Sequence, residues 1–526
     1  MDALLLARIQ FAFTVGFHFI FPPISIGLAW MLVLLEWRGW QRHDETAVQA
    51  GKWLGKLLAI TFAVGVATGI VMEFQFGTNW AQYSKFVGDI FGAPLAAEGV
   101  FAFFLESTFL GVYLFARDRV AKWFHWFSIL MVAVGSTLSA FWIIVANSWQ
   151  QTPTAYTIVN GRAELTDFWE AVFNPSTLPR YFHVIVACLI TGAFFCAGMA
   201  AWHLIKNPSA PFARTALKTS VVFGLIASVA AVMPTGHWHA IQVAQTQPSK
   251  FAAIEGLYET QSNPPMVVFG WPTDDPPTLH GAIEIPGLMP IFLQQDPSIE
   301  VPGLDKFPPE DRPPLWLPFM SFHAMVALGM WFILLMSLAT LQLYRGKLWQ
   351  DKRILRALLY SIPLPVVVCE LGWIVAEVGR QPWVVYGLMR TKDGHSTTVG
   401  VAEVAFSLAL FATIYAVLFA LWLFLISKHG RAIPAAAGPA GLLASEASHP
   451  SSTLPPSEPR EHDTVSVQHH SQRPGERDSD LPSVPSSRPP SRDVDADRPT
   501  RDSSPASSDP APSAPRPSNP NTEVHK

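Results

Sequence analysis

Nine long apolar runs occupy residues 1–430 and constrain the fold of this chain more than any other feature. A run of about 20 apolar residues is long enough to cross the hydrocarbon core of a bilayer as a helix. The composition agrees, since 50% of the 526 residues are hydrophobic and only 14% are charged, whereas soluble domains carry about a quarter. The sequence therefore predicts an all-α, polytopic membrane helical bundle with about nine transmembrane helices. The predicted spans are 10–36, 54–73, 95–116, 124–146, 183–205, 219–236, 320–343, 355–378 and 399–427.

Lys and Arg are concentrated in alternate connections between these spans. They follow the first, third, fifth and seventh spans, as with Arg38 and Arg42 or Arg345 and Lys347. Because cytoplasmic connections carry the excess of basic residues, we expect the N-terminus outside and the C-terminus in the cytoplasm. The net charge is −4 and no basic block occurs, so the sequence gives no support for a nucleic-acid partner.

The composition divides the chain into four parts. Residues 1–236 would form transmembrane helices 1 to 6, and residues 320–430 would form helices 7 to 9. The Pro-rich connection 237–319 would lie outside the membrane. In residues 431–526 Ser, Pro, Asp and Arg dominate. Such a segment cannot bury a core, so the sequence predicts a disordered cytoplasmic tail.

Five side chains that could bind a metal or carry a proton fall in the outer half of the membrane. His18 lies in the first span, and His183 and Met325 lie near the outer ends of the fifth and seventh. Glu98 belongs to the start of the third span and Glu377 to the end of the eighth. Unrelated structural charges would not be expected to share one depth, which favours a functional site. Taken alone, a His is more often a hydrogen-bonded core residue, and a Met is more often ordinary core packing.

Two acids of the third span, Glu98 and Glu106, are eight residues apart. On a continuous α-helix they would be separated by about 12 Å along the axis and by about 80° in azimuth. Two acids near one face of a span suit a proton relay or a contact to a metal. The alternative is a pair of buried, protonated acids that hold neighbouring helices together.

The end of the eighth span carries a second polar face. Glu370, Trp373 and Glu377 fall on one side of a helix. Ionisable groups inside an apolar span are costly, and they therefore indicate function. The alternative for Glu377 is a helix-end carboxylate paired with Arg380 at the membrane surface.

Five blocks of sequence together resemble subunit I of the cytochrome bd family of quinol oxidases. The resemblance covers residues 1–430, nearly all of the chain that is expected to be ordered. The blocks are Gly77-Thr78-Asn79-Trp80, Gly88-Asp89-Ile90-Phe91-Gly92-Ala93-Pro94-Leu95, Phe103-Phe104-Leu105-Glu106-Ser107-Thr108, Gln247-Pro248-Ser249-Lys250 and Gly379-Arg380-Gln381-Pro382-Trp383.

The resemblance implies a quinol:oxygen oxidoreductase of the bacterial cytoplasmic (inner) membrane. It would oxidise a membrane quinol, ubiquinol or menaquinol, on the outer side and reduce oxygen to water. The implied cofactors are two haem b and one haem d, or a third haem b in its place. The enzyme would generate a membrane potential without a proton pump. The resemblance also implies a second membrane subunit and allows a small accessory subunit.

The resemblance assigns haem-binding roles to several residues. His183 and Met325 match the axial ligands of the low-spin haem b. His18 and Glu377 match the ligands of the two high-spin haems, and family members differ in which ligand serves which haem. Arg380 matches an arginine near the haem propionates, a role that suits its charge.

Further residues match proton, electron and quinol functions. Glu98 matches an acid at one high-spin haem, and Glu106 matches the proton-delivery acid beside it. Trp373 matches a tryptophan between haems. Lys250 and Glu255 match the quinol-site pair of the external loop, and on a helix they would approach a headgroup from two sides. The alternative for this pair is an exposed surface turn.

The sequence departs from the family pattern in three respects. His323 stands where many relatives have Arg, and on a helix it would point away from Met325. The external loop is short, as in the branch often called cyanide-insensitive oxidases. The Pro- and Ser-rich tail has no counterpart in the family pattern.

A proton- or ion-coupled transporter without haem is the main alternative function. It would also need intramembrane acids, but it would show internal repeat symmetry, which this sequence lacks. A haem anchor that only passes electrons would typically carry paired His ligands. A haem–copper oxidase would need a histidine cluster, and no predicted span contains adjacent histidines.

Overall fold

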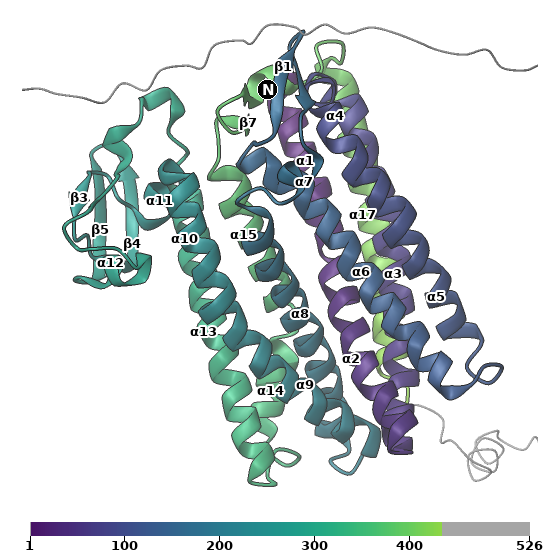
Figure 1. The fold of residues 1–526 in the computed structure, drawn as a ribbon. Helices are drawn as coiled ribbons and strands as arrows, with labels where there is room; N and C mark the ends of the chain where they lie inside the picture. The colour runs from purple at the N-terminus through teal and green to yellow at the C-terminus, as the bar shows by residue number, and fades with distance from the viewer. Residues whose placement is uncertain (1, 434–526) are drawn as a thin grey trace, which may run out of the picture. The chain divides into compact units, whose positions relative to one another are not determined.

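The structure, a computed structural model, describes residues 2–433. Nine helical segments in this range are long and apolar enough to cross a membrane, which confirms the predicted number (Figure 1). Five segments are single helices: α3 (Glu45–Thr78), α6 (Lys122–Gln151), α8 (Thr177–Lys206), α13 (Trp316–Tyr344) and α17 (Val401–Gly430). The predicted tail, residues 431–526, lies almost entirely outside the described residues.

The other four spans are built from shorter helices that continue one another. They are α1 (Ala3–Phe19) with α2 (Phe21–Gln41), α4 (Ala81–Ala97) with α5 (Phe104–Phe115), α9 (Pro211–Ala230) with α10 (His237–Thr246), and α14 (Lys352–Tyr360) with α15 (Leu364–Val378). Proline lies near every join, because its ring and missing N–H disturb the helical ladder. Pro22 is the second residue of α2, and Pro363 precedes α15.

Two joins are π-helical segments, η1 (Glu98–Phe103) and η2 (Ala231–Gly236). Pro94 lies one turn before η1, and Pro234 lies inside η2. A π-helical turn is wider than an α-helical one and is frequent at functional sites. The azimuth predicted for Glu98 and Glu106 assumed a continuous α-helix, so it does not apply across η1.

The sixth span is longer than the sequence predicted. Its last helix, α10, continues to Thr246, so the predicted boundary at residues 236 and 237 falls inside the span. Polar side chains lowered the apparent hydropathy of this stretch. One of them, Gln242, is buried and donates to Ser176 Oγ at 2.7 Å. The Gln242 amide group is thus bonded to the start of α8 inside the bundle, where its polarity suggested a helix end.

The strands and short helices gather at the end of the bundle that carries the N-terminus (Figure 1). The external loop holds α11 (Pro248–Glu255), β3 (Gln261–Ser262), β4 (Met266–Asp274), β5 (Pro277–Ile285), α12 (Leu288–Leu293), β6 (Glu300–Val301) and the 3₁₀ turns Leu304–Lys306 and Pro309–Asp311. The other connections at this end hold β1 (Tyr156–Val159), β2 (Arg162–Leu165), α7 (Phe168–Val172), β7 (Trp383–Val385), β8 (Met389–Arg390) and α16 (Thr391–Gly394). Antiparallel hairpins pair β1 with β2, β4 with β5 and β7 with β8.

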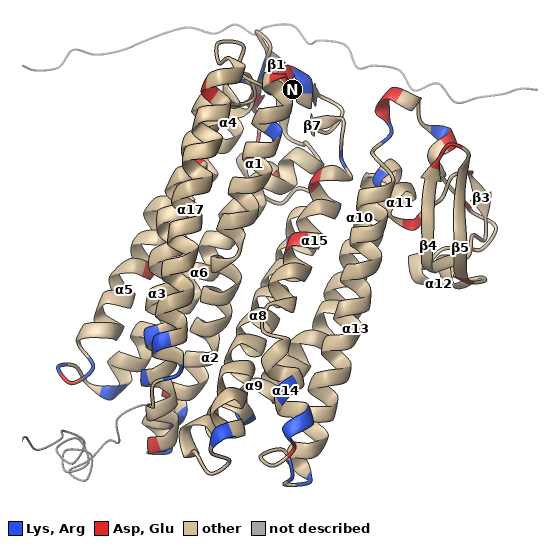
Figure 2. Ribbon diagram, turned by 180° about the vertical axis from the view of Figure 1, so that it is seen from behind, with Lys and Arg blue, Asp and Glu red and all other residues tan. Residues whose placement is uncertain are grey.

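Lys and Arg residues gather mainly at the opposite end (Figure 2). There α2 meets α3, α5 meets α6, α8 meets α9, and α13 meets α14 through short connections. The long connections all lie at the end with fewer basic residues. The two ends of the described bundle therefore differ in both charge and loop length.

Helices α2 and α8 approach so closely that only glycine fits between them. A Cβ on Gly27 would lie 2.3 Å from the Cys188 carbonyl oxygen, and a Cβ on Gly192 would lie 2.3 Å from the Gly27 carbonyl carbon. Small residues permit this backbone approach, which is a main source of packing energy between membrane helices.

We expect Gly27→Ala to destabilise the bundle by about 1–3 kcal/mol, because even one methyl group would force the two backbones apart. The measurement is thermal unfolding of the purified enzyme in detergent. Gly111→Ala on α5 is the matched control, since nothing lies within 4 Å of a Cβ there. A Gly27→Ala protein as stable as the Gly111→Ala protein would contradict the close packing.

Candidate functional site

His18 lies at the end of α1 and faces Thr68 on α3. The His18 Nδ1 atom is 3.0 Å from Thr68 Oγ1. The Thr68 hydroxyl hydrogen is already directed to backbone carbonyls, those of Val64 at 3.1 Å and Gly65 at 3.0 Å. Thr68 therefore accepts, His18 carries its proton on Nδ1, and the Nε2 lone pair is left available.

His183, on α8, repeats this arrangement with Thr235 of η2. The His183 Nδ1 atom lies 3.5 Å from Thr235 Oγ1, and that hydroxyl donates to the Ala230 carbonyl at 2.9 Å. The same tautomer follows for His183, with Nε2 as the unprotonated nitrogen. A second partner on the far ring nitrogen is typical of histidines that ligate metals.

Met325 and His323 point in different directions from α13, as the sequence predicts. The Met325 Sδ atom would lie 3.5 Å from a Cβ on Gly372, so the thioether faces α15. His323 Nε2 lies 3.1 Å from the Val267 carbonyl of β4, and its Nδ1 lies 2.9 Å from the Phe319 carbonyl. His323 therefore attaches the external loop to α13 instead of facing Met325.

Glu377 lies at the centre of a cluster of polar side chains where α6 and α15 end, at the end of the bundle that carries the N-terminus. Asn147 Nδ2 donates to its Oε1 atom at 2.9 Å, and Gln151 Nε2 donates to the same oxygen at 3.3 Å. Arg380 forms a short ion pair with the other oxygen. The pairing proposed as the alternative for Glu377 is thus present. A carboxylate has about four acceptor sites, and these three donors leave one unused.

Lys250 belongs to the same cluster although it comes from the external loop. Its Nζ atom donates to Gln151 Oε1 at 2.5 Å and to Gln247 Oε1 at 2.7 Å. Its aliphatic stem packs on Gly379, where a Cβ would lie 3.0 Å from Lys250 Cγ. Burial, assisted by the Arg180 guanidinium, lowers the pKa of the Lys250 ammonium group well below its usual range.

Glu255 is buried at the end of α11 without a donor. Its side chain is 2% exposed, and its Oε2 atom has no hydrogen-bond partner among the described residues. Burial raises the pKa of Glu255 to about 8. Lys250 is equally buried, at 1% exposed, so the alternative of an exposed surface turn is wrong for this pair.

The two acids of the third span have different surroundings. Ser139 Oγ donates to Glu98 Oε1 at 2.6 Å. Glu106 is buried against Gly135 of α6, and none of the residues 2–433 donates a hydrogen bond to its carboxyl group. The neighbouring Ser107 hydroxyl instead donates to the Phe103 carbonyl at 2.8 Å. Glu106 therefore does not hold a neighbouring helix through a hydrogen bond.

Trp373 and Glu370 connect α15 to the first helix. The Trp373 ring meets Phe19, next to His18, edge to face with 5.2 Å between ring centroids. Glu370 Oε2 would lie 3.2 Å from a Cβ on Gly16, and its Oε1 atom has no partner among the described residues. The polar face predicted for α15 is thus directed towards α1.

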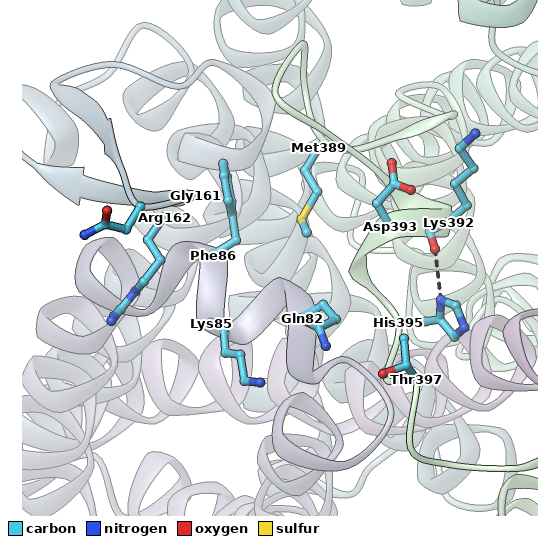
Figure 3. A pocket seen from close by; sticks show the side chains of 11 residues that line it. Gln82, Lys85, Phe86, Gly161, Arg162, Met389, Lys392, Asp393, His395 and Thr397 are labelled. Atoms are coloured by element: carbon cyan, nitrogen blue, oxygen red, sulfur yellow. Dashed lines mark hydrogen bonds between the residues drawn. The ribbon is translucent and has the colours of Figure 1, made fainter.

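Two cavities open among the connections near these residues. One of about 420 Å³ is lined by Gln151 and Thr246, and by Tyr156 and Tyr386. Another of about 860 Å³ lies between α4, the β1–β2 turn and α16 (Figure 3). None of the predicted site residues lines this second cavity, so its size does not mark the chemical site. 

Residues 6–434 match the family model described as "Cytochrome bd terminal oxidase subunit I". The match covers nearly the whole described chain. This chain belongs to that family.

Individual relatives agree with the assignment. The cytochrome bd ubiquinol oxidase subunit 1 of Bacillus subtilis (strain 168) is 40% identical over an alignment 439 positions long; the match covers 81% of this chain and 93% of the relative. The cytochrome bd-II ubiquinol oxidase subunit 1 of Escherichia coli (strain K12) is 35% identical over an alignment 504 positions long; the match covers 83% of this chain and 98% of the relative. The structure of bd oxidase from Geobacillus thermodenitrificans matches with a TM-score of 0.78 and 32% identity, and covers 82% of this chain and 98% of that chain.

Cytochrome bd subunit I is a multi-pass protein of the bacterial cytoplasmic membrane and part of a terminal quinol oxidase. The coupled-transporter alternative is therefore excluded. The family implies haem cofactors, and the side chains present fit them. His18 and His183 both present an unprotonated Nε2 atom, the ring nitrogen that suits an iron ligand.

Several polar partners in this site were not predicted from the sequence. They are Thr68, Thr235, Asn147, Arg180 and Gln151. The last residues of α6 did contain a signal, since Asn147 and Gln151 are four residues apart and so share one helix face. The two threonines carried no such signal, because a lone Thr in a span usually bonds only its own backbone.

Replacing Thr68 by Val keeps the side-chain volume but removes the acceptor that orients His18. If His18 binds haem, we expect its affinity for that haem to fall by about 10–100-fold, as for loss of a second partner of a metal-binding His. The measurement is haem content per protein and the reduced-minus-oxidised spectrum.

Thr61→Val is the matched control, because Thr61 makes the same backbone bond on α3 but accepts from Trp422 instead of a His. Equal haem loss in the two variants would show that packing, not the orientation of His18, explains the defect.

Proposed function

We propose that this chain is the subunit of a cytochrome bd-type oxidase that holds three haems and oxidises quinol at the outer face. The observation that carries the proposal is the shared geometry of His18 and His183. Two histidines on different helices each hold a proton on Nδ1 and present Nε2. Each histidine therefore offers the ring nitrogen that suits haem iron, while a neighbouring threonine orients the ring.

His183 and Met325 would be the axial ligands of a low-spin haem b, and His18 and Glu377 would each bind one high-spin haem. The haems would be two haem b with one haem d, or with a third haem b. When bound, they would supply electron transfer and the reduction of oxygen. Trp373 would lie between haems, and Arg380, whose Nε atom has no partner among the described residues, would face propionates.

The orientation follows from the distribution of charge. The basic end of the bundle would face the cytoplasm, with the N-terminus and the external loop outside. Residues 247–315 would bind ubiquinol or menaquinol through Lys250 and Glu255. A second membrane subunit completes the enzyme, and a small accessory subunit would be compatible with it.

Protons for oxygen reduction would come from the cytoplasm through the inner half of the third span. Glu106 follows Glu98 by eight residues and so lies further inward. Since no described residue donates to it, its carboxyl group is free to accept a proton from the inside and pass it towards Glu98. Uptake inside and release outside would generate a membrane potential without a pump.

Pigment extraction with mass analysis, together with a reduced-minus-oxidised spectrum of the purified enzyme, tests the haem content. We expect a low-spin band and high-spin bands that respond to carbon monoxide. A spectrum without high-spin, carbon-monoxide-reactive haem would contradict the proposed oxygen-reducing role of this subunit.

Glu106→Gln is nearly isosteric but cannot release a proton. We expect steady-state oxygen uptake to fall by at least about 100-fold, the lower end of the range for loss of a proton-transfer group. Stopped-flow reduction of the low-spin haem by quinol should remain rapid, because the quinol site is distant. Normal oxygen uptake and potential generation in liposomes would contradict the proton path.

Glu255 should make quinol oxidation depend on pH. Its pKa is about 8, so the carboxyl group is neutral below that pH and becomes a proton acceptor above it. We expect the rate of quinol oxidation to rise as pH passes through 8, and Glu255→Gln to be slow and without this inflection. An unchanged pH profile in Glu255→Gln would remove Glu255 from the reaction.

A further inference from the structure

Gln151 ends α6 and is the only side chain described here that bonds both the quinol-loop lysine and the Glu377 carboxylate. Its Oε1 atom accepts from Lys250 Nζ at 2.5 Å. Its Nε2 atom donates to Glu377 Oε1 at 3.3 Å and to the Ala376 carbonyl at 3.4 Å. The side chain is fully buried, at 0% exposed.

The orientation of this amide is fixed by chemistry. The Glu377 carboxylate only accepts hydrogen bonds, so the Gln151 NH₂ group faces it and Gln151 Oε1 is left to accept from Lys250 Nζ. If the Gln151 amide were rotated by 180°, its NH₂ group would face the Lys250 donor and its oxygen would face the Glu377 acceptor. The contact between the amide oxygen and the carboxylate would then be repulsive, so a single orientation satisfies both neighbours.

The backbone of Gln151 adds a second attachment to the loop. Gln247 Nε2 donates to the Gln151 carbonyl oxygen at 3.1 Å, while Gln247 Oε1 accepts from Lys250 Nζ at 2.7 Å. Lys250 is therefore held between two glutamines. Only one of these, Gln151, also bonds Glu377. The cavity of about 420 Å³ at the outer face has Gln151 in its lining, which places this link beside the loop surface.

We infer that Gln151 is a positioning residue of the quinol reaction, which holds the Lys250 side chain in its working position and joins it to the Glu377 cluster. The inference rests on the proposed role of Lys250 at the quinol site. A quinol that is oxidised loses two electrons and two protons. A lysine that binds the quinol headgroup must be held in place, because a flexible side chain would spend little time in the position that the reaction needs.

A double-mutant cycle tests the inference in the complete purified enzyme, with decylubiquinol as the quinol and ascorbate with a phenylenediamine mediator as an artificial donor. The variants are Gln151→Met, Lys250→Met and the two combined. Loss of a hydrogen bond to a charged group is worth about 1.5–3 kcal/mol, so we expect kcat/KM for decylubiquinol to fall at least about tenfold in Gln151→Met. Oxygen uptake with the artificial donor is measured in parallel, and the loss with decylubiquinol should exceed the loss with the artificial donor, because Gln151 also contacts Glu377.

The combined variant separates positioning from general destabilisation. If Gln151 acts through Lys250, the combined variant should be no slower with quinol than Lys250→Met alone. Gln150→Met is the matched control: Gln150 is its buried neighbour but bonds Tyr83, so quinol kinetics should not change.

Three results would overturn the inference. They are normal quinol kinetics in Gln151→Met, additive losses in the combined variant, and an equal loss in Gln150→Met. Normal kinetics in Lys250→Met would instead overturn the proposed quinol role of Lys250, and the role of Gln151 with it. The two failures are therefore distinguishable.

Discussion

A charged side chain buried in an apolar span is costly unless other groups pair with it. This constraint explains how the helices are held at the end of the bundle that carries the N-terminus. One charged side chain at the middle of a span costs about 2.5–3.5 kcal/mol on insertion scales. Glu377 offsets this cost with donors from Arg380, Asn147 and Gln151. Because these donors come from α6 and from the turn after α15, the carboxylate fixes the two helix ends against each other. Lys250 then attaches the external loop to the same cluster through Gln151.

The basic end of the bundle meets the same constraint with a separate cluster. Glu36 of α2 forms a short ion pair with Arg117 and accepts from the Tyr113 hydroxyl at 2.9 Å. His125 of α6 lies 3.7 Å from the same carboxylate. This cluster joins α2, α5 and α6 near the ends at which α2 and α5 finish and α6 begins. At each end of the bundle, a carboxylate with several hydrogen-bond donors therefore holds neighbouring helices together. Glu377 does so at one end and Glu36 at the other.

The sequence contained enough to predict the spans but not their ends. Apolar length is a local property, so nine runs predicted nine helices. The end of α10 depends on neighbours that bury Gln242, and the π-helical turns depend on how Pro94 and Pro234 are accommodated. In the site, too, the residues could be predicted from the sequence, but the contacts that depend on packing could not. Resemblance and depth could name His18 and Lys250, whereas the contact of Lys250 with Gln151, 99 residues earlier, arises only when the loop packs on the bundle.

The number of donors around each acid separates two kinds of carboxyl group. Glu36 and Glu377 each accept hydrogen bonds from several donors, which tie them to neighbouring helices. Glu106 and Glu255 are buried, and no described residue donates to them, so nothing in their surroundings fixes the charged form. A group that takes up and releases protons must exchange between both forms during turnover. Glu106 and Glu255 lie where proton uptake and proton release are proposed, one in the third span and one in the loop between α10 and α13. The acids with donors lie where helix ends have to be held together.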